Sequence, residues 1–180
     1  MTYSPIEHGC LCDSCPLNGR AVVVPPEIRP GRPLCAGQEP GKNEERELKP
    51  FIGKSGKEFM EALRQAGLRR EQVSVTNARL CRLPNYKAHV ADDRKSLECC
   101  RPRLIDEMRA APATLLMGAH AFMSAVGFED VGEEGLQRSQ GYPIEVDVTL
   151  PHDLAPKKVK AVAVVHPAAV LRKRRLTEDF

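Results

Sequence analysis

Four cysteines constrain this chain most, because their spacing predicts that distant segments meet at one metal centre. Cys12 and Cys15 are separated by two residues, whereas Cys81 and Cys100 arrive singly from later segments. Cysteine thiolates bind zinc or iron–sulfur clusters. A zinc ribbon favours two close pairs, and ligands as scattered as these suit a larger cluster. We therefore expect the fold to bring residues 12–15 beside Cys81 and Cys100.

Three further cysteines are weaker candidates for the same site. Cys10 and Cys99 are sequence neighbours of the expected ligands and are alternatives to them. We favour Cys100 over Cys99 because Cys100 directly precedes an Arg-Pro pair and lies four residues before Leu104, which is expected to face inward. Cys35 falls in an apolar run and is expected to be a small buried hydrophobe.

Length and composition predict a single domain, residues 1–180, with no membrane contact. No apolar run approaches the length that crosses a bilayer, and the N-terminus lacks the basic start and apolar stretch of a signal peptide. We expect a cytoplasmic protein and a monomer. Thiols stay reduced in the cytoplasm, so seven cysteines favour metal ligation over disulfides.

Apolar runs and helical periodicity alternate along the chain. The predicted strands are 32–36, 73–76, 113–117 and 160–165; the predicted helices are 56–66, a helix from about residue 102, and 119–126; residues 83–96 are expected to begin as a loop, and 127–158 to be loops with a short strand or two. Such alternation indicates an α/β fold with a parallel sheet covered by helices on both faces.

Polar or glycine-rich segments follow three of the predicted strands. They are the loop Gly37-Gln38-Glu39-Pro40-Gly41, Asn77 and His166. In open parallel sheets, ligands bind at the carboxyl ends of the strands. The sequence therefore predicts a site where these three segments meet.

Basic residues cluster near the C-terminus in the run 172–175, and Arg69, Arg70, Arg79 and Arg82 add to them. Phosphate backbones attract such clusters, although a solvated surface is the alternative. Aromatic residues are only 4% of the chain and tryptophan is absent, which argues against a stacking platform of several rings.

Seven motifs occur in an order that resembles the family 4 uracil-DNA glycosylases, the iron–sulfur branch of the uracil-DNA glycosylase superfamily. The motifs are Cys12-x-x-Cys15-Pro-Leu, the Gly-x-x-Pro-Gly loop, Lys49-Pro-Phe-Ile-Gly53, Ser55-Gly56, Thr76-Asn77-x-x-x-Cys81-Arg82, Cys100-x-Pro102-x-Leu104 and His166-Pro-Ala-Ala. The resemblance covers about residues 10 to 172.

This resemblance implies a three-layer α/β/α fold around a four-stranded, mainly parallel sheet. It implies a [4Fe-4S] cluster on the four favoured cysteines, with a structural role. It also implies a DNA-repair hydrolase that cleaves the N-glycosidic bond of uracil in DNA. The chain has no obvious lysine nucleophile for lyase chemistry, so we expect a monofunctional enzyme.

The glycine-proline loop departs from the family pattern. The usual glutamate position holds Gln38, and the next position holds Glu39. This order is similar to the Gly-Gln-Asp-Pro loop of family 1 enzymes, in which the acid after the glutamine activates water. Which of Gln38 and Glu39 dominates water activation is therefore open.

Glycosidic cleavage develops positive charge on the sugar and negative charge on the leaving base. A carboxylate near the sugar stabilises that cation and orients water, and Glu39 is our candidate. A donor facing a base oxygen stabilises the leaving anion, and His166 fits this role, as the resemblance also implies. The alternatives are a surface carboxylate in a turn and a structural histidine.

The base has to leave the duplex to be reached. Asn77 both donates and accepts hydrogen bonds, which suits the edge of uracil, and Phe51 is placed to stack on the flipped ring. Their structural alternatives are a turn asparagine and a core phenylalanine. The resemblance places Glu44 near C5 of the base and leaves the amides of Gln38 and Gly41 for base contacts.

The residues expected to hold DNA phosphates are Lys54, Ser55, Lys57 and Arg172. Two other functions stay open. One is a glycosylase for another base, such as a 5-substituted uracil, hypoxanthine or xanthine, which the loop departure motivates. The other is a non-catalytic or covalent uracil-DNA-binding module, for which His89 stands in the corresponding region without the Arg-Arg-Ile-His signature.

Overall fold

The computed structural model of this chain describes residues 3–25, 28–84, 90–128, 133–150 and 152–178, with the side chains of 90, 133–134 and 174–178 excluded. His89, on which the covalent alternative depends, lies outside the described residues. No helix in the described ranges combines the length and the apolar character needed to cross a membrane.

The structure is built from five strands, six α-helices and two short 3-10 turns over its described ranges. In chain order these are a 3-10 turn at Cys12–Ser14, β1 (Leu34–Gly37), α1 (Lys42–Glu47), α2 (Lys54–Gln65), a 3-10 turn at Arg70–Gln72, β2 (Ser74–Asn77), α3 (Val90–Arg109), β3 (Thr114–Met117), α4 (Ala119–Val126), α5 (Glu133–Ser139), β4 (Pro143–Asp147), β5 (Lys158–Val164) and α6 (Pro167–Glu178).

The strands form one mixed sheet in the order β2-β1-β3-β5-β4. Neighbours among β2, β1, β3 and β5 are parallel, and only β4 runs antiparallel, at the edge beside β5. The predicted α/β fold with a mainly parallel sheet is confirmed. The sheet has five strands rather than four, because β4 adds an antiparallel edge strand from the segment expected to hold mostly loops.

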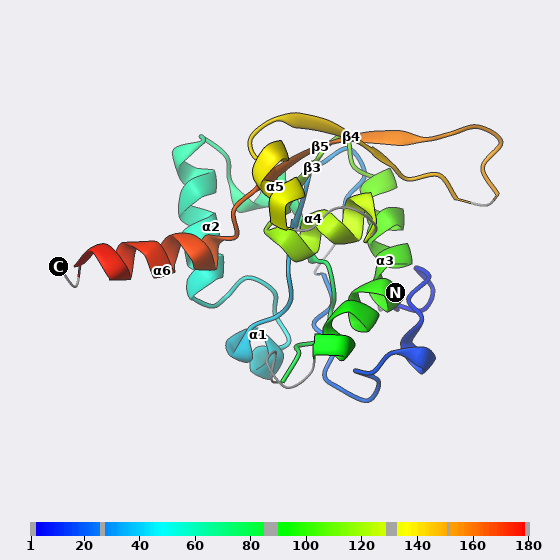
Figure 1. The fold of residues 1–180 in the computed structure, drawn as a ribbon, viewed down its shortest axis with the longest axis horizontal. Coiled ribbons are helices and arrows are strands. Elements are labelled where there is room, and N and C mark those ends of the chain that lie inside the picture. Colours follow the sequence, from blue (N-terminus) through cyan, green and yellow to red (C-terminus); the bar gives the residue numbers. More distant parts are fainter. Residues whose placement is uncertain (1–2, 26–27, 85–89, 129–132, 151, 179–180) are drawn as a thin grey trace.

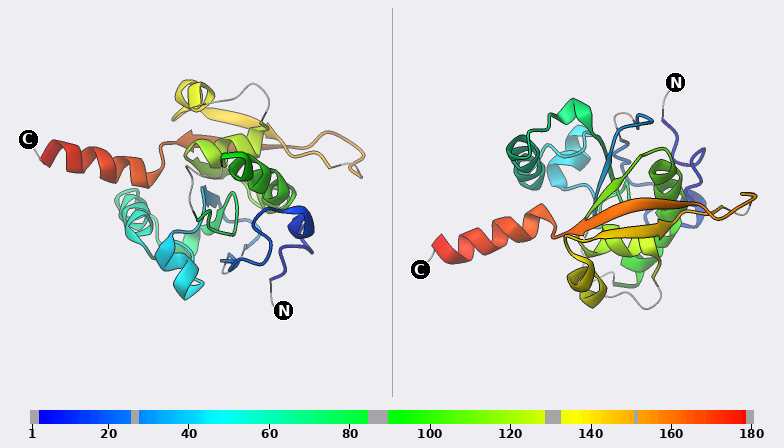
Figure 2. Two further views of the ribbon diagram at one scale, coloured as in Figure 1. Left: turned by 60° about the horizontal axis from the view of Figure 1, so that its bottom comes forward. Right: turned by 90° about the horizontal axis from the view of Figure 1, so that it is seen from above.

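Successive side chains of each strand supply opposite faces of the sheet, so the core divides into two layers. Cys35 and Met117 face α2, packing with Phe59 and Leu63. The opposite face packs against α3, α4 and α5 through a larger apolar cluster. Figures 1 and 2 show the sheet between these two groups of helices, which is a three-layer α/β/α arrangement.

The carboxyl end of β1 is a topological switch point. The chain passes from β1 to β2 through α2 on one face, and from β2 to β3 through α3 on the other. Connections that diverge in this way leave a crevice above the strand ends. The loop after β1 opens into this crevice.

The expected loop over residues 83–96 is wrong in its second half. Helix α3 begins at Val90 rather than near Pro102, which lies within the helix. The polar residues that gave a loop-like pattern include Asp93 and Ser96, which are buried and bind the side chain of Arg79. An inward polar face therefore concealed the helical period.

Candidate active site

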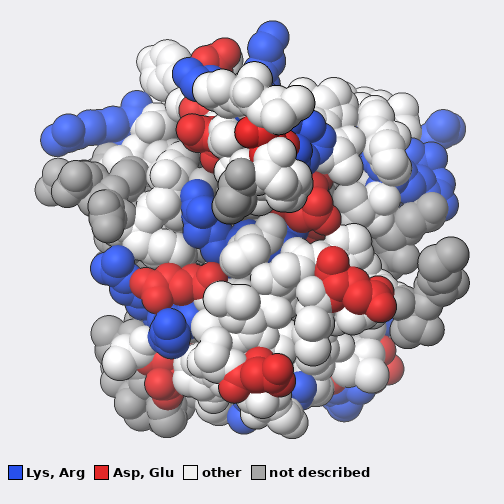
Figure 3. Space-filling model, turned by 90° about the vertical axis from the view of Figure 1, so that its right-hand side faces the viewer, with Lys and Arg blue, Asp and Glu red and all other residues white. Residues whose placement is uncertain are grey.

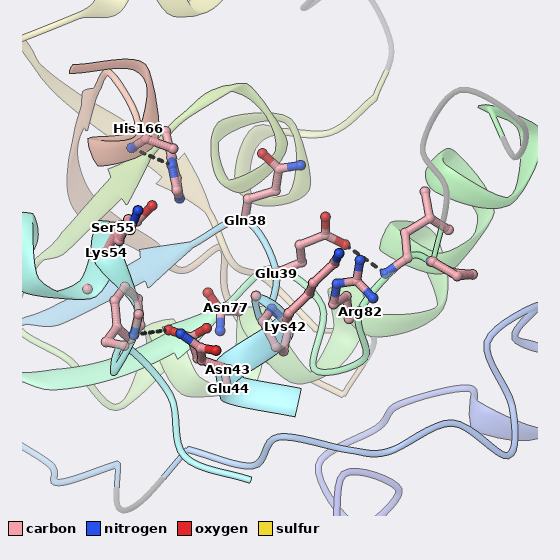
Figure 4. Close-up of a pocket in the computed structure, with 18 of the residues that line it drawn as sticks. Gln38, Glu39, Lys42, Asn43, Glu44, Lys54, Ser55, Asn77, Arg82 and His166 are labelled. Atoms are coloured by element: carbon pink, nitrogen blue, oxygen red, sulfur yellow. Dashed lines mark hydrogen bonds between the residues drawn. The ribbon is translucent and has the colours of Figure 1, made fainter. Parts of the chain in front are cut away.

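A cavity of about 770 Å³ opens at the carboxyl ends of the parallel strands. Ten of the eleven residues proposed from the sequence to touch base or DNA, or to act in catalysis, line this central cavity: Gln38, Glu39, Gly41, Glu44, Phe51, Lys54, Ser55, Asn77, His166 and Arg172. Lys57 does not line it; it is exposed one helical turn beyond Lys54 on α2. Figure 4 shows the polar side chains of the loop, Asn77 and His166 around one space.

Glu39 is held by one of its two carboxylate oxygens. Its Oε2 accepts the backbone N–H of Leu83 at 2.9 Å and the Nε–H of Arg79 at 3.0 Å. The Glu39 side chain is 22% exposed, whereas that of Arg79 is fully buried. The carboxylate thus lies at the cavity wall with its direction fixed from behind.

His166 follows β5 and presents its ring to the cavity. Its Nδ1 accepts the backbone N–H of Ala168 at 3.2 Å, so the neutral ring carries its proton on Nε2. Burial, reinforced by Arg172 and His120, lowers the pKa of His166 to about 4. Near neutral pH the side chain is therefore an uncharged hydrogen-bond donor.

Gly118 makes room for His166. It has a φ of +89°, and a Cβ at this position would lie 2.9 Å from the Cβ of His166. Its N–H donates to the carbonyl of Val164 at 2.8 Å, which ties the end of β3 to the end of β5. A side chain at Gly118 would strain the backbone and displace the imidazole.

Asn77 ends β2 opposite Gly37 of β1. A Cβ at Gly37 would lie 2.6 Å from Oδ1 of Asn77 and 3.0 Å from the ring of Phe51. The absence of a side chain at Gly37 therefore lets the carboxamide and the aromatic ring converge. Arg103 fixes the backbone below, because its Nη2 donates to the carbonyl of Asn77 at 2.6 Å.

Glu44 lies on α1 with a buried side chain. Its Oε1 accepts the backbone N–H of Gly53 at 2.6 Å. Glycines at 41 and 53 allow this, since a Cβ at Gly41 would lie 2.6 Å from Oε2 of Glu44 and a Cβ at Gly53 would lie 2.9 Å from Oε1. The contact links the loops that enter α1 and α2 and gives the cavity one acidic wall.

Some cavity residues were not recognised from the sequence: Lys42 and Leu83 were assigned no role, and Arg82 was assigned only to the dispersed basic residues. Lys42 opens α1, a helix whose six residues carry too few apolar side chains to be recognised by periodicity. Arg82 and Leu83 follow β2, and their place after a strand was the available signal. Nothing in the sequence indicated that the Leu83 amide binds Glu39.

Six of the seven cysteines line a second, smaller cavity of about 70 Å³: Cys10, Cys12, Cys15, Cys81, Cys99 and Cys100. Cys35 is buried in the sheet core, as expected. Within the described ranges no three His, Cys, Asp or Glu side chains converge tightly enough to hold a single metal ion. Cys10 and Cys99, the alternative ligands considered from the sequence, line the same cavity as the four favoured cysteines.

The chemistry of this cysteine cavity fits a polynuclear thiolate centre. Burial and the nearby Cys100, Cys15 and Cys12 raise the pKa of Cys81 to about 12, so these sulfurs repel one another as thiolates. The backbone N–H of Leu17 donates to Cys15 Sγ at 3.4 Å, a contact typical of cluster sulfurs. A cationic iron core would offset the repulsion among the thiolates.

The surface around the central cavity offers groups for an anionic backbone. Helix α2 begins at Lys54, and no side chain forms a capping hydrogen bond with its first backbone N–H groups. A side cavity of about 250 Å³ lies between this helix start and α6, lined by Lys54, Ser55, Ala168, Leu171 and Arg172. The face at the right-hand side of Figure 1, in contrast, mixes acidic and basic residues (Figure 3).

Comparison with known proteins agrees with the geometry. The sequence profile of the "Uracil DNA glycosylase superfamily" matches residues 31–180. A type-4 uracil-DNA glycosylase of Pyrobaculum aerophilum is 33% identical, over 94% of this chain and 84% of the relative. The type-4 enzyme of Archaeoglobus fulgidus is 32% identical over 82% and 70%, and that of Thermotoga maritima 28% over 91% and 79%. The chain belongs to the uracil-DNA glycosylase superfamily and is similar to type-4 enzymes of that superfamily.

Proposed function

We propose that this protein is a monofunctional uracil-DNA glycosylase acting in base-excision repair. The observation that carries the proposal is the convergence of Glu39, Asn77 and His166 on one cavity at the strand ends. The bond that breaks joins C1′ of the deoxyribose to N1 of uracil, and its electron pair leaves with the base. A water molecule supplies the new bond to C1′.

Each of the three side chains has a role in this reaction. The uracil is extruded from the duplex and its ring lies near Phe51, with its polar edge toward the Asn77 carboxamide. The Nε2–H of His166 donates to a base oxygen as negative charge builds there. Glu39 faces the sugar, stabilises its positive charge and accepts a proton from the attacking water.

The cavity walls set which bases fit. Glu44 is held by Gly53 and limits the space near C5 of the base, which would exclude thymine. The amides of Gln38 and Gly41 are available for base contacts. Lys54, Ser55 and Arg172 bind phosphates beside the cavity, and Lys57 extends this contact along α2.

We further propose that Cys12, Cys15, Cys81 and Cys100 hold a [4Fe-4S] cluster. When bound, the cluster supplies a multiply thiolate-ligated cross-link between the N-terminal segment, the loop after β2 and α3. Two observations support it, namely the shared cavity of these cysteines and the N–H donated to Cys15. The cysteine that follows β2 lies four residues after Asn77, so the cluster braces the loop that the site uses.

The proposal is tested by release of free uracil from an oligonucleotide with one deoxyuridine. We expect an abasic product without strand cleavage and without borohydride trapping, although Lys42 and Lys54 line the cavity. Glu39→Gln should lose most activity and keep DNA binding, whereas Glu47→Gln, at an exposed α1 carboxylate, should match wild type. Wild-type rates in the Glu39 variant would remove Glu39 from the mechanism.

The reversed order of Gln38 and Glu39 motivates one alternative, excision of another modified base. Duplexes with 5-substituted uracil, hypoxanthine or xanthine separate it from the main proposal. Faster release of any of these than of uracil would replace uracil as the substrate. A DNA adduct that survives boiling in detergent would instead support the covalent module.

A further inference from the structure

The guanidinium of Arg79 binds helix α3 through one edge and Glu39 through the other. Arg79 lies two residues beyond Asn77 and is fully buried. Its Nη1 donates to Asp93 Oδ1 at 2.6 Å, to the Asp93 carbonyl at 3.1 Å and to Ser96 Oγ at 2.9 Å. These three acceptors on α3 fix the plane of the group.

The opposite edge of the same group faces the cavity carboxylate. Nε of Arg79 donates to Glu39 Oε2 at 3.0 Å, and Nη2 lies 2.8 Å from the same oxygen. Oε2 also accepts the Leu83 amide at 2.9 Å. Three nitrogens thus surround one oxygen, and no described residue donates a hydrogen bond to Oε1.

This arrangement differs from that of a simple structural ion pair. Asp93 already supplies a buried countercharge for Arg79, and Asp93 in turn lies 3.0 Å from Nε2 of His120. The contact with Glu39 is therefore additional to the charge balance of the buried cluster. Its effect is to hold a partly exposed carboxylate in one direction at the cavity wall.

We propose that Arg79 is a positioning residue that acts through Glu39, holding Oε2 so that Oε1 is presented to the attacking water. The inference rests on the proposed glycosylase function. Positioning of this kind matters because misplacement of a reacting group by about 1 Å can cost on the order of 100-fold in rate. The contact between Arg79 and Glu39 also favours Glu39 over Gln38 as the water-activating residue, because Arg79 fixes the side chain of Glu39. The hydrogen bond between Arg79 and Gln38 joins their backbones, where the N–H of Arg79 donates to the Gln38 carbonyl at 3.2 Å.

A double-mutant cycle tests the inference. Single-turnover uracil release is measured at saturating protein for wild type, Glu39→Gln, Arg79→Met and the double variant. We expect Arg79→Met to slow the wild type at least about tenfold and to slow Glu39→Gln less than about threefold, because residues that act as a unit are not additive. Affinity for DNA with a non-cleavable uracil analogue should change less than about threefold, giving a loss in rate rather than in binding.

A purely structural role predicts a different result. Arg79→Met would then slow Glu39→Gln by the same factor as it slows wild type, and this outcome overturns the inference. Arg109→Met, which breaks a partly buried ion pair with Asp153 away from the cavity, is the matched control and should retain the wild-type rate. An inactive wild type would overturn the proposed function itself. An active wild type in which Arg79→Met acts equally in both backgrounds would overturn only the inference about Arg79, so the two failures are distinguishable.

A variant that keeps the charge extends the test to the case in which Arg79→Met does not fold. Arg79→Lys retains a cation but cannot bind α3 and Glu39 through two edges of one planar group. The same cycle is carried out with it. We expect a folded protein with a rate between wild type and Glu39→Gln, and a wild-type rate for Arg79→Lys would overturn the inference.

Discussion

Nδ1 of His166 accepts the backbone N–H of Ala168, and this contact assigns the ring proton to Nε2. The histidine pKa is lowered from its usual 6.5 to about 4, chiefly by burial. We therefore expect the ring to stay neutral, with Nε2 protonated, from pH 8 down to about pH 5. Nitrogen-15 NMR of histidine-labelled protein checks this, with the signal assigned by its loss in His166→Asn. A ring that becomes protonated near pH 6.5 would contradict the assignment.

The same pKa shift predicts a dependence of stability on pH. Between pH 6.5 and about 4 the unfolded chain binds a proton at His166 that the folded chain does not, so the free energy of unfolding falls as the pH is lowered through this window. His166→Gln should reduce this slope. Denaturant unfolding of both proteins at pH 7.0 and pH 4.5 measures it. A slope in His166→Gln equal to that of the wild type would contradict the lowered pKa of His166.

Gly118 provides a second way to test the position of His166. Gly118→Ala should slow uracil release at least about tenfold, because its Cβ would lie 2.9 Å from that of His166 and displace the donor. Gly141→Ala is a close control, since Gly141 has a φ of +80° against +89° but nothing within 4 Å of an added Cβ. Gly118→Ala should also lose roughly 1–3 kcal/mol of stability, because a φ of +89° with a ψ of 168° is a backbone region that is essentially restricted to glycine. If Gly118→Ala and Gly141→Ala release uracil at the same rate, displacement of His166 does not explain the effect of Gly118→Ala.

Most of the fold was predictable because local signals and tertiary structure agree in its central strands. The runs that predicted β1 and β3 are apolar and lie next to glycine or proline, and β1 and β2 are buried along their whole length. Strand β5 instead alternates exposed and buried positions in its first half, and His166-Pro167 marks its end. The strand-end rule then brought the glycine-proline loop, Asn77 and His166 together without any structural information. Edge strand β4 was less visible because its burial pattern is mostly exposed.

The support of the site was much less predictable. Arg79 was considered only as part of a basic cluster, yet it is buried among Glu39, Asp93 and Ser96. Its partners lie 40 residues before it and 14 and 17 residues after it, so no local pattern connects them. Burial of a charge depends on tertiary partners, which composition does not reveal.

Replacing single cysteines by serine tests the proposed cluster. We expect the wild type to be brown with broad absorbance near ~400 nm and to lose this on substitution of Cys12, Cys15, Cys81 or Cys100. Cys35→Ser is the control, because Cys35 lies in the sheet core away from the cysteine cavity. If Cys100→Ser keeps the full absorbance and Cys99→Ser or Cys10→Ser loses it, the fourth ligand is that cysteine and not Cys100. A colourless protein with one zinc per chain would overturn the cluster itself.

Arg103 connects the helix that carries Cys100 to the strand that ends at Asn77. It is fully buried and donates to the carbonyls of Asn77 and Ala78 at 2.6 and 3.1 Å, and to Glu107 Oε2 at 2.6 Å. Arg103→Met should cost about 3–5 kcal/mol in the free energy of unfolding, because it leaves Glu107 as an uncompensated buried charge. Denaturant unfolding under anaerobic conditions measures the loss.

A second substitution separates the charge effect from the lost carbonyl contacts. Glu107→Gln removes the stranded charge while keeping an acceptor for the Tyr3 hydroxyl, which donates to Glu107 Oε1 at 2.5 Å. Arg103→Met with Glu107→Gln should therefore recover at least about 1 kcal/mol relative to Arg103→Met alone. A double variant no more stable than the single one would mean that the unpaired carbonyls of Asn77 and Ala78 account for the whole loss.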